Sequence, residues 1–219
     1  MKGMFICFEG GEGAGKTSQV SAALEVVGAM TGQEALRTRE PGGTVNAEAI
    51  RSILIAENAD HDSITNTLLF AAARREHVER LIRPQLEQGT TIVTDRFVLS
   101  TLAYQGAEGV DQGFIRRLHE DTTGGLMPHL TIILDIDPRI GIERSRSRLE
   151  ASGSNESRFE GYDLEFHDRM RSIMLSYDLS PSIVIDASRP QEEVERDVRG
   201  VVAAFVSKHL GIEQDGSEV

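Results

Sequence analysis

The chain has 219 residues, of which 39% are hydrophobic and 26% are charged, as is ordinary for a water-soluble globular protein with a sizeable core. Its formal net charge of -12 at pH 7 argues against a protein that coats DNA or RNA, because nucleic acid phosphates would be repelled. A small phosphorylated ligand is compatible with this charge, since a few local cations and backbone N–H groups can reverse the field inside one cleft.

Short runs of β-branched and aromatic residues alternate with longer stretches of helical periodicity. The runs predict strands at residues 4–8, 34–38, 90–94, 130–136 and 181–186. The stretches predict helices at residues 16–30, 45–56, 64–88, 112–122, 139–149, 164–179 and 191–210. Several strands are almost continuously apolar, which is typical of strands covered on both faces of a parallel sheet. The alternation predicts a doubly wound α/β domain with a five-stranded parallel sheet.

No internal repeat divides the chain, so we expect one domain over residues 1–210. Residues 150–158 are rich in Ser and Gly, and four arginines bracket them: Arg144, Arg146, Arg148 and Arg158. Such a segment beside a phosphate site is typical of a lid, here about residues 144–160, but an ordinary solvated loop explains it equally well. The polar and acidic residues 211–219 predict a disordered tail.

The single cysteine, Cys7, lies in the first apolar run, which predicts a small buried hydrophobic side chain. One cysteine cannot form a disulfide within the chain, and this is typical of a reducing compartment. The first residues lack the apolar core of a signal peptide, and no stretch approaches the length of a membrane span. We therefore expect a cytoplasmic protein.

Residues 10–17, GGEGAGKT, match the phosphate-loop pattern G-x-x-x-x-G-K-[ST] between a predicted strand and a predicted helix. In such a loop the glycines let backbone N–H groups surround the phosphates, and the helix adds the positive end of its dipole. Lys16 would reach the β- and γ-phosphates, and the Thr17 hydroxyl would bind magnesium. The predicted ATP-binding residues are Gly10, Gly11, Glu12, Gly13, Ala14, Gly15, Lys16, Thr17 and Ser18. The motif does not identify the acceptor of the phosphoryl group.

An acidic residue is expected near the magnesium ion, at the carboxyl end of a neighbouring strand. Asp95 closes the third predicted strand and Arg96 follows it, so an acid and a cation share the edge where open α/β sheets bind ligands. Asp135 in the fourth strand is an alternative, although the adjoining Asp137-Pro138 predicts a turn and a helix start more simply.

Three further segments bear on the acceptor. Residues 38–44, TREPGGT, follow the second predicted strand and predict a shaped turn with a charged pair, Arg39 and Glu40, at its lip. Phe70 and Arg74 are four residues apart and share a helix face, where they could hold a base. A core Phe and a surface ion-paired Arg explain the same two residues more simply. The segment after the third strand, 95–106, adds polar groups and a tyrosine.

The segments EGGEGAGKTS, TREPGGT, FAAAR and DRFVLSTLAYQG, in this order, closely resemble the motifs of bacterial thymidylate kinases. The resemblance runs from about residue 4 to residue 190, and four ordered motifs are far more specific than the phosphate loop alone. It implies a P-loop nucleoside monophosphate kinase fold and a Mg²⁺-dependent transfer of the γ-phosphoryl group of ATP to dTMP. The product would be dTDP, for dTTP biosynthesis. The resemblance also implies a homodimer packed through helices.

The resemblance further implies roles at the acceptor site. Phe70 would stack on thymine, Arg74 would bind its exocyclic oxygen, and Arg96 would hold the 5′-phosphate. Tyr104 would fill the space that a ribose 2′-hydroxyl needs. Glu40-Pro41 corresponds to a cis peptide bond in similar proteins. The implied dTMP-binding residues are Glu12, Arg39, Pro41, Phe70, Arg74, Arg96, Thr101, Tyr104 and Gln105.

Thymidylate kinases place a catalytic arginine either in the phosphate loop or in the lid. The loop here contains no Arg, so the chain resembles the second type, and Arg158 is the best candidate in the lid. Arg144 and Arg148 would grip ATP, with Ala187 at the border of the adenine. The implied catalytic residues are Lys16, Asp95, Arg96 and Arg158, and the implied magnesium site is Thr17 with Asp95.

Two other classes stay open from the residues themselves. One is a P-loop kinase for another nucleoside monophosphate or for a deoxynucleoside, since the phosphate loop does not choose the acceptor. The other is a P-loop switch whose output is a protein contact. The sequence has no N-K-x-D guanine motif, and residues 121–124, DTTG, match D-x-x-G only where a helical stretch ends.

Overall fold

The computed structural model of the protein describes residues 3–56, 60–152 and 162–212. At its centre lies a five-stranded sheet in which all neighbouring strands are parallel, in the order β2-β3-β1-β4-β5. The strands are β1 (Phe5–Gly10), β2 (Leu36–Arg39), β3 (Ile92–Asp95), β4 (Leu130–Asp135) and β5 (Ser182–Asp186). The predicted fold is confirmed, and each strand boundary lies within two residues of its expected position.

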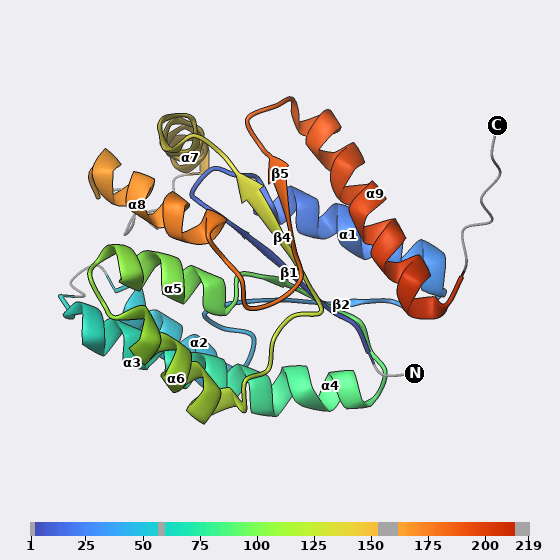
Figure 1. Ribbon diagram of the computed structural model, residues 1–219, viewed down its shortest axis with the longest axis horizontal. Helices are drawn as coiled ribbons and strands as arrows, with labels where there is room; N and C mark the ends of the chain where they lie inside the picture. The colour runs from blue at the N-terminus through green and yellow to red at the C-terminus, as the bar shows by residue number, and fades with distance from the viewer. Residues whose placement is uncertain (1–2, 57–59, 153–161, 213–219) are drawn as a thin grey trace.

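Helices cover both faces of the sheet (Figure 1). They are α1 (Lys16–Thr31), α2 (Val45–Leu54), α3 (Ser63–His77), α4 (Arg83–Glu87), α5 (Val98–Ala107), α6 (Gln112–Thr123), α7 (Pro138–Ser152), α8 (Leu164–Leu175) and α9 (Gln191–Leu210). Helices α1 and α9 pack against each other on one side of the sheet, and α3, α5 and α6 lie on the other (Figure 1).

The central strand β1 contributes to both cores because successive side chains point to opposite faces. Phe5 and Cys7 pack into the core beneath α5, whereas Ile6 and Phe8 pack into the core shared with α1 and α9. All four are buried, and Cys7 is 1% exposed, as expected of a small core side chain. This burial on both faces explains why β1 and β4 are nearly continuous apolar runs in the sequence.

Helix α5 is an element that the sequence pattern does not predict. Eight of its residues are buried: Val98, Leu99, Thr101, Leu102, Ala103, Tyr104, Gln105 and Ala107. A helix buried on nearly every side has no polar face, so the apolar periodicity that reveals a surface helix is missing. Its N-cap residue, Phe97, has no side chain that could cap the first turn, so the usual signal of a helix start is missing as well.

Three of the predicted helices differ from the observed ones by more than two residues. The helix predicted over 64–88 is divided into α3, a π-helical turn (Val78–Ile82) and α4, and Pro84 in the first turn of α4 has no N–H to continue the regular pattern. Helix α8 ends at Leu175 rather than at 179. Helix α7 extends to Ser152, into the segment predicted as a loop. The rest of that segment, including Arg158, lies outside the described residues.

The end of α6 confirms one interpretation of the sequence. Gly124 follows Thr123 in the left-handed conformation and donates its N–H to the carbonyl oxygen of Glu120. Residues 121–124 therefore form a helix terminus, as the sequence predicts.

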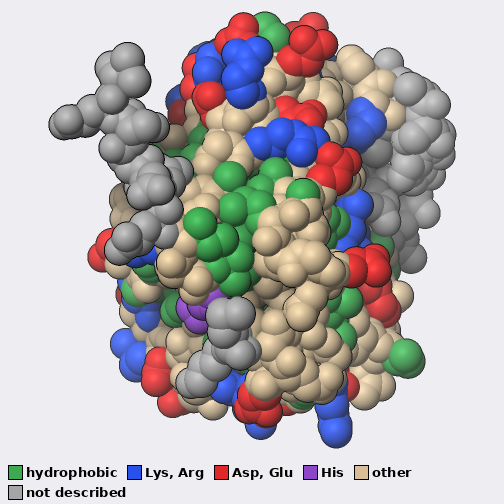
Figure 2. All heavy atoms as spheres, turned by 90° about the vertical axis from the view of Figure 1, so that its right-hand side faces the viewer, with side chains coloured by type: hydrophobic (Ala, Val, Ile, Leu, Met, Phe, Trp, Pro, Cys, Tyr) green, Lys and Arg blue, Asp and Glu red, His purple; other side chains and the backbone are tan. Residues whose placement is uncertain are grey.

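Figure 2 shows the face that lies on the right of Figure 1. Lys and Arg side chains lie next to Asp and Glu side chains there, around a group of hydrophobic side chains, so this face has no broad basic field. Within the described ranges no helix is long and apolar enough to cross a bilayer.

Candidate active site

The phosphate loop lies between β1 and α1, as residues 10–17 predict. Gly13 and Gly15 have φ angles of 68° and 82°, in the left-handed region that glycine enters without strain. A Cβ atom on Gly13 would lie 2.0 Å from the carbonyl oxygen of Gly141, because α7 packs directly on the loop. Gly141 is therefore a residue of the site that the sequence did not single out.

Lys16 begins α1 and folds its side chain over the loop. Its ammonium group donates to the carbonyl oxygens of Gly10, at 3.0 Å, and Gly11, at 2.9 Å. Burial is the largest influence on this group and, together with the nearby Arg96, lowers the pKa of Lys16. The loop thus holds a buried cation where the phosphates of a nucleotide are expected.

Arg96 follows β3 and brings a second cation to the same loop. Its φ of 70° is the one positive value among the described residues other than glycine, and such a conformation costs on the order of 1–3 kcal/mol. The guanidinium donates to the carbonyl oxygen of Gly10 at 3.2 Å and to Ser100 Oγ at 3.0 Å. Its central carbon lies 5.1 Å from the centre of the Tyr104 ring. These contacts hold the strained conformation in place.

Glu12 projects from the loop toward the same guanidinium. Its Oε1 accepts from Arg96 at 3.0 Å and from the Tyr104 hydroxyl at 2.7 Å. Burial raises the pKa of Glu12, but Arg96 and Lys16 outweigh it and lower that pKa to about 2. Burial also raises the pKa of Tyr104, so its phenol stays protonated and can donate. The loop, β3 and α5 therefore meet in one charged network.

Glu9 is a second residue that the sequence did not single out. It lies in β1, fully buried, and accepts from the backbone N–H groups of Phe97 at 2.8 Å and Ser100 at 3.1 Å. Its other oxygen accepts from the Ser100 hydroxyl at 2.6 Å. Burial raises the pKa of Glu9, and the hydrogen bond from Ser100 opposes that rise. Glu9 therefore caps α5 from a neighbouring strand and orients the serine that contacts Arg96.

Arg74 lies inside the protein rather than on its surface. It is 4% exposed, donates from Nε to Glu40 Oε2 at 2.7 Å and from Nη2 to Thr101 Oγ1 at 2.8 Å. The simpler expectation of a surface ion pair is therefore wrong about its location. Burial raises the pKa of Glu40, but Arg74 and then His77 outweigh it, so that pKa is lowered.

His77 completes this buried cluster. Its Nδ1 lies 3.1 Å from Glu40 Oε1, and its Nε2 lies 2.7 Å from Thr38 Oγ1. A Cβ atom on Gly43 would lie 2.5 Å from Nε2, so the turn after β2 closes directly over the imidazole. Glu40-Pro41 is a cis peptide bond, as the resemblance implies. His77 lies 39 residues from Thr38 in the sequence, so no local sequence pattern predicts this contact.

The remaining residues of the predicted acceptor site are placed differently. Phe70 is half-buried on α3, one helical turn from Arg74. Gln105 is buried in α5. Arg39 is exposed and bonds Glu48 at 3.0 Å and the Pro41 carbonyl at 2.9 Å. Of the two charged residues expected at the lip of this turn, only Arg39 is exposed, and Glu40 is buried beside Arg74 and His77.

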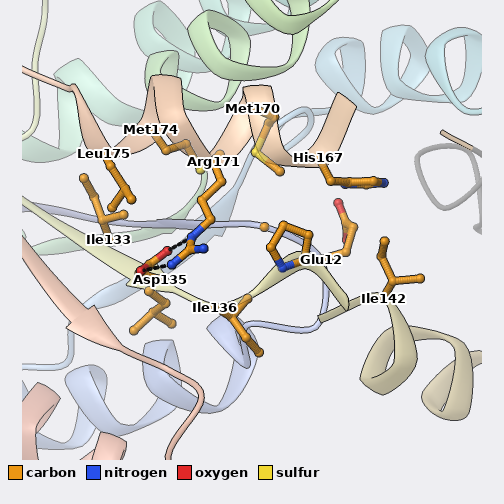
Figure 3. A pocket seen from close by; sticks show the side chains of 13 residues that line it. Glu12, Ile133, Asp135, Ile136, Ile142, His167, Met170, Arg171, Met174 and Leu175 are labelled. Atoms are coloured by element: carbon orange, nitrogen blue, oxygen red, sulfur yellow. Dashed lines mark hydrogen bonds and ion pairs between the residues drawn. The ribbon is translucent and has the colours of Figure 1, made fainter. Parts of the chain in front are cut away.

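The two candidate acids differ in their partners. Asp135 pairs with Arg171 through two hydrogen bonds of 2.6 Å and 2.8 Å, which occupy both of its oxygens (Figure 3). Asp95 ends β3, and its Oδ1 is buried without a hydrogen-bond partner among the described residues. Thr17 is exposed on the first turn of α1. An unsatisfied carboxylate oxygen at the sheet edge fits a cation, and Asp95 is therefore the better candidate.

Arg144 connects α7 to the segment after β5. Its guanidinium donates to the carbonyl oxygens of Ala187 at 2.8 Å and Ser188 at 3.1 Å. Arg148, one turn further along α7, donates to Ser145 Oγ at 3.2 Å. Arg144 and Ala187, both predicted at the donor site, are thus brought together.

Comparison with known proteins gives consistent matches. A family model described as thymidylate kinase matches residues 8–198. A thymidylate kinase of Cereibacter sphaeroides is 43% identical over 213 residues, which cover 94% of this chain and 97% of the relative. Thymidylate kinases of Caulobacter vibrioides and Symbiobacterium thermophilum are each 42% identical, over 206 and 214 residues. These alignments cover 92% and 94% of this chain, and 96% of each relative.

Proposed function

The chain belongs to the thymidylate kinase family and is a nucleotide kinase with thymidylate kinase function, and we propose that the site around Lys16 and Arg96 performs this reaction. The single observation that supports this placement is the position of Arg96. Its strained backbone brings one guanidinium to the phosphate loop, Glu12 and Tyr104 together. An acceptor phosphate bound there would face a donor phosphate in the loop.

At the donor side, ATP would bind with its phosphates in the loop of residues 10–18. Lys16 already lies over that loop. In a glycine-rich loop of this kind the backbone N–H groups would bind the phosphates. Arg144 is fixed by hydrogen bonds to the carbonyl oxygens of Ala187 and Ser188, and its guanidinium would stack on the adenine ring.

Magnesium would be held by Thr17 and Asp95. The unpartnered Oδ1 of Asp95 supports this assignment, as does the hard oxygen chemistry of a hydroxyl with a carboxylate. Among the described residues no cluster of three or more His, Cys, Asp or Glu could enclose a metal. In kinases Mg²⁺ is usually bound by one or two protein oxygens together with substrate phosphates and water. When bound, the ion supplies positive charge to the phosphates.

At the acceptor side, dTMP would bind between α3 and α5. Phe70 would stack on the base, and Arg74 with Thr101 would bind its polar edge, since Glu40 and Thr101 fix the guanidinium. Arg96 would hold the 5′-phosphate. Tyr104, locked by its hydroxyl to Glu12, would exclude a ribose 2′-hydroxyl.

The transfer would be direct and in line. Two nucleotide anions repel as they approach, so the protein must neutralise charge and align the acceptor oxygen with the γ-phosphorus. Lys16 and Arg96 provide fixed cations, and their hydrogen bonds to backbone oxygens limit reorganisation during the reaction. Arg148 and the lid residue Arg158 would add charge, although Arg158 lies outside the described residues. No protein nucleophile is required.

A homodimer would place a second copy against α2 and α3. Large apolar side chains are exposed on these helices: Val45 by 88%, Ile53 by 48%, Ile64 by 45% and Leu68 by 48%. Exposed apolar groups collected on adjacent helices are typical of a protein interface.

The acceptor is tested by measuring ADP formation from ATP and Mg²⁺ with no acceptor, with dTMP, with dUMP and with ribothymidine monophosphate. The last two differ from dTMP by one methyl and one 2′-hydroxyl, so each isolates one contact. We expect strong stimulation by dTMP and weak stimulation by ribothymidine monophosphate. Tyr104→Ala should raise kcat/KM for the ribonucleotide relative to dTMP by about tenfold, with Tyr177→Ala as a control outside the network. ADP formation that ignores dTMP would contradict the proposal.

A further inference from the structure

Helix α8 packs on the phosphate loop, as α7 does. A Cβ atom on Gly11 would lie 3.5 Å from the Met170 Cε atom, which is ordinary van der Waals contact. Figure 3 shows Met170 and His167 on neighbouring turns of α8, with both side chains on the side of the helix where Glu12 lies. Side chains of α8 therefore reach the loop that would hold the nucleotide.

One polar atom on this side of α8 has no partner. His167 is 1% exposed, and its Nε2 is buried and makes no hydrogen bond within the described part of the chain. Figure 3 shows its ring beside Glu12. A buried imidazole nitrogen without a partner is unfavourable, and buried polar groups are nearly always satisfied by protein or by ordered water.

A small space separates His167 from the loop, bounded by the end of β4, the start of α7 and one face of α8 (Figure 3). Its volume is about 20 Å³, which is room for one water molecule. Four of its lining residues carry polar side chains: Glu12, Asp135, His167 and Arg171. Asp135 and Arg171 bind each other at the end away from His167 (Figure 3). Glu12 and His167 are therefore the side chains that remain to bind a water.

Both hydrogen bonds that Glu12 accepts end on the same carboxylate oxygen. Its Oε1 accepts from Arg96 at 3.0 Å and from the Tyr104 hydroxyl at 2.7 Å, whereas Oε2 accepts none from the described residues. A carboxylate only accepts, and a neutral imidazole donates through one nitrogen and accepts through the other. A water between the two would donate one O–H to Glu12 Oε2 and accept the Nε2–H of His167. Both groups would then be satisfied.

We propose that His167 is a positioning residue for phosphoryl transfer, which holds the Glu12 carboxylate in place through one buried water. The role rests on the proposed function, because Arg96 and Tyr104 are assigned there to the acceptor phosphate and sugar. Glu12 Oε1 contacts both of them, so a rotation of its carboxylate would release both at once. His167 itself touches neither nucleotide, and its proton stays on Nε2 throughout.

The water and the proton are tested on the full chain without nucleotides. We expect a high-resolution crystal structure to show one ordered water within hydrogen-bond distance of both His167 Nε2 and Glu12 Oε2. We expect ¹⁵N NMR of labelled histidine to show a neutral His167 ring with its proton on Nε2, assigned by the loss of its signals in His167→Gln. A proton on Nδ1, or no water between the two atoms, would overturn the proposal.

Three variants separate the hydrogen bond from the ring and from polarity. In His167→Gln the amide nitrogen reaches the place of Nε2, in His167→Asn it is one methylene too short, and His167→Phe keeps a ring without nitrogen. We expect His167→Asn and His167→Phe to lower kcat/KM for dTMP by about tenfold and His167→Gln by less than about threefold. KM for ATP should change less than kcat/KM for dTMP, because the Lys16 hydrogen bonds to the loop are retained.

Urea unfolding of the same variants distinguishes positioning from a purely structural role. His167→Phe should be at least as stable as the wild type, because its ring needs no partner, and yet be less active. Full activity in His167→Phe, or equal damage by Gln and Asn, would contradict the proposal, and the Gln and Asn pair decides if His167→Phe fails to fold. A wild type that does not phosphorylate dTMP would instead count against the proposed function, while the water and the proton on Nε2 are measured without any nucleotide.

Discussion

Gly141 of α7 and Glu12 of the phosphate loop meet through their backbones. A Cβ atom on Gly141 would lie 2.4 Å from the carbonyl oxygen of Glu12, closer than real Cβ contacts occur. The helix that leads into the proposed lid is therefore seated directly on the loop that would hold ATP. Movement of one element must be accommodated by the other.

Gly141→Ala should therefore displace the loop and raise KM for ATP about tenfold or more, with some loss of stability. Gly200→Ala in α9 is the matched control, since a Cβ atom there meets nothing within 4 Å. That control should leave the kinetics unchanged and raise the free energy of unfolding by about 0.5–1 kcal/mol, because alanine is the better helix former. Steady-state kinetics and urea unfolding of both variants test this. Equal KM values in the two variants would contradict the argument.

Glu9 connects the centre of the sheet to Arg96 through Ser100. Glu9→Ala removes the acceptor of two backbone N–H groups at the start of α5, which should cost about 1–3 kcal/mol of stability. It should also lower kcat/KM for dTMP by roughly tenfold or more, because Ser100 and then Arg96 lose their orientation.

Glu9→Gln is the matched control for this role. Its amide oxygen can still accept both N–H groups, and its NH₂ can donate to the Ser100 hydroxyl. Most of the activity and stability should therefore return. If Gln were as damaging as Ala in both assays, the charge of Glu9 rather than its capping geometry would matter.

The contrast between Lys16 and Glu9 explains how much of the site the sequence predicts. Lys16 acts within a contiguous motif whose spacing sets the geometry, so its place over the loop follows from the local sequence. Glu9 acts through Ser100, 91 residues away, and only the parallel pairing of β1 with β3 brings them together. The strands and most helices were predictable from apolar runs and periodicity, whereas the fully buried α5 carries neither signal.

Arg39 and Glu40 also show that local sequence does not determine which partner a side chain contacts. The sequence predicted both charges at the lip of one turn, but Arg39 pairs with Glu48 at the surface, whereas Glu40 pairs with Arg74 in the interior. Sequence proximity cannot decide which of two neighbouring side chains faces the core. The burial of Arg74 could not be predicted either, because its partners lie in two distant segments: Glu40 follows β2, and Phe97 and Thr101 lie at the start of α5.

Arg74 and Glu40 form a buried ion pair whose coupling can be measured. Arg74→Met leaves a buried carboxylate with only His77 beside it, which should cost about 3–5 kcal/mol. Glu40→Gln should cost less than Arg74→Met, since Arg74 retains Thr101. The double variant should be more stable than the sum of the single effects predicts, by about 1–3 kcal/mol. Urea unfolding of the wild type, the two single variants and the double variant completes the double-mutant cycle. Single effects that add within about 0.5 kcal/mol would show that Arg74 and Glu40 are not coupled.

His119 of α6 makes stability depend on pH. Its ring packs edge-on against Phe97 with the centroids 5.6 Å apart, and its Nε2 lies 2.9 Å from the Leu126 carbonyl oxygen. Burial, and then the charge of Arg74, lowers the pKa of His119 to about 4. The unfolded chain should titrate near the ordinary value of about 6.5.

Between these two pKa values the unfolded state binds more protons than the folded state. The free energy of unfolding therefore decreases as the pH falls from about 6.5 to about 4. The difference in pKa corresponds to about 3 kcal/mol. His119→Gln cannot take up this proton, so its stability should fall less over the same range. Urea unfolding of both proteins at pH 7, 6, 5 and 4 measures the difference, in which acidic groups common to both cancel. Parallel curves would show that His119 is not the source of the acid sensitivity.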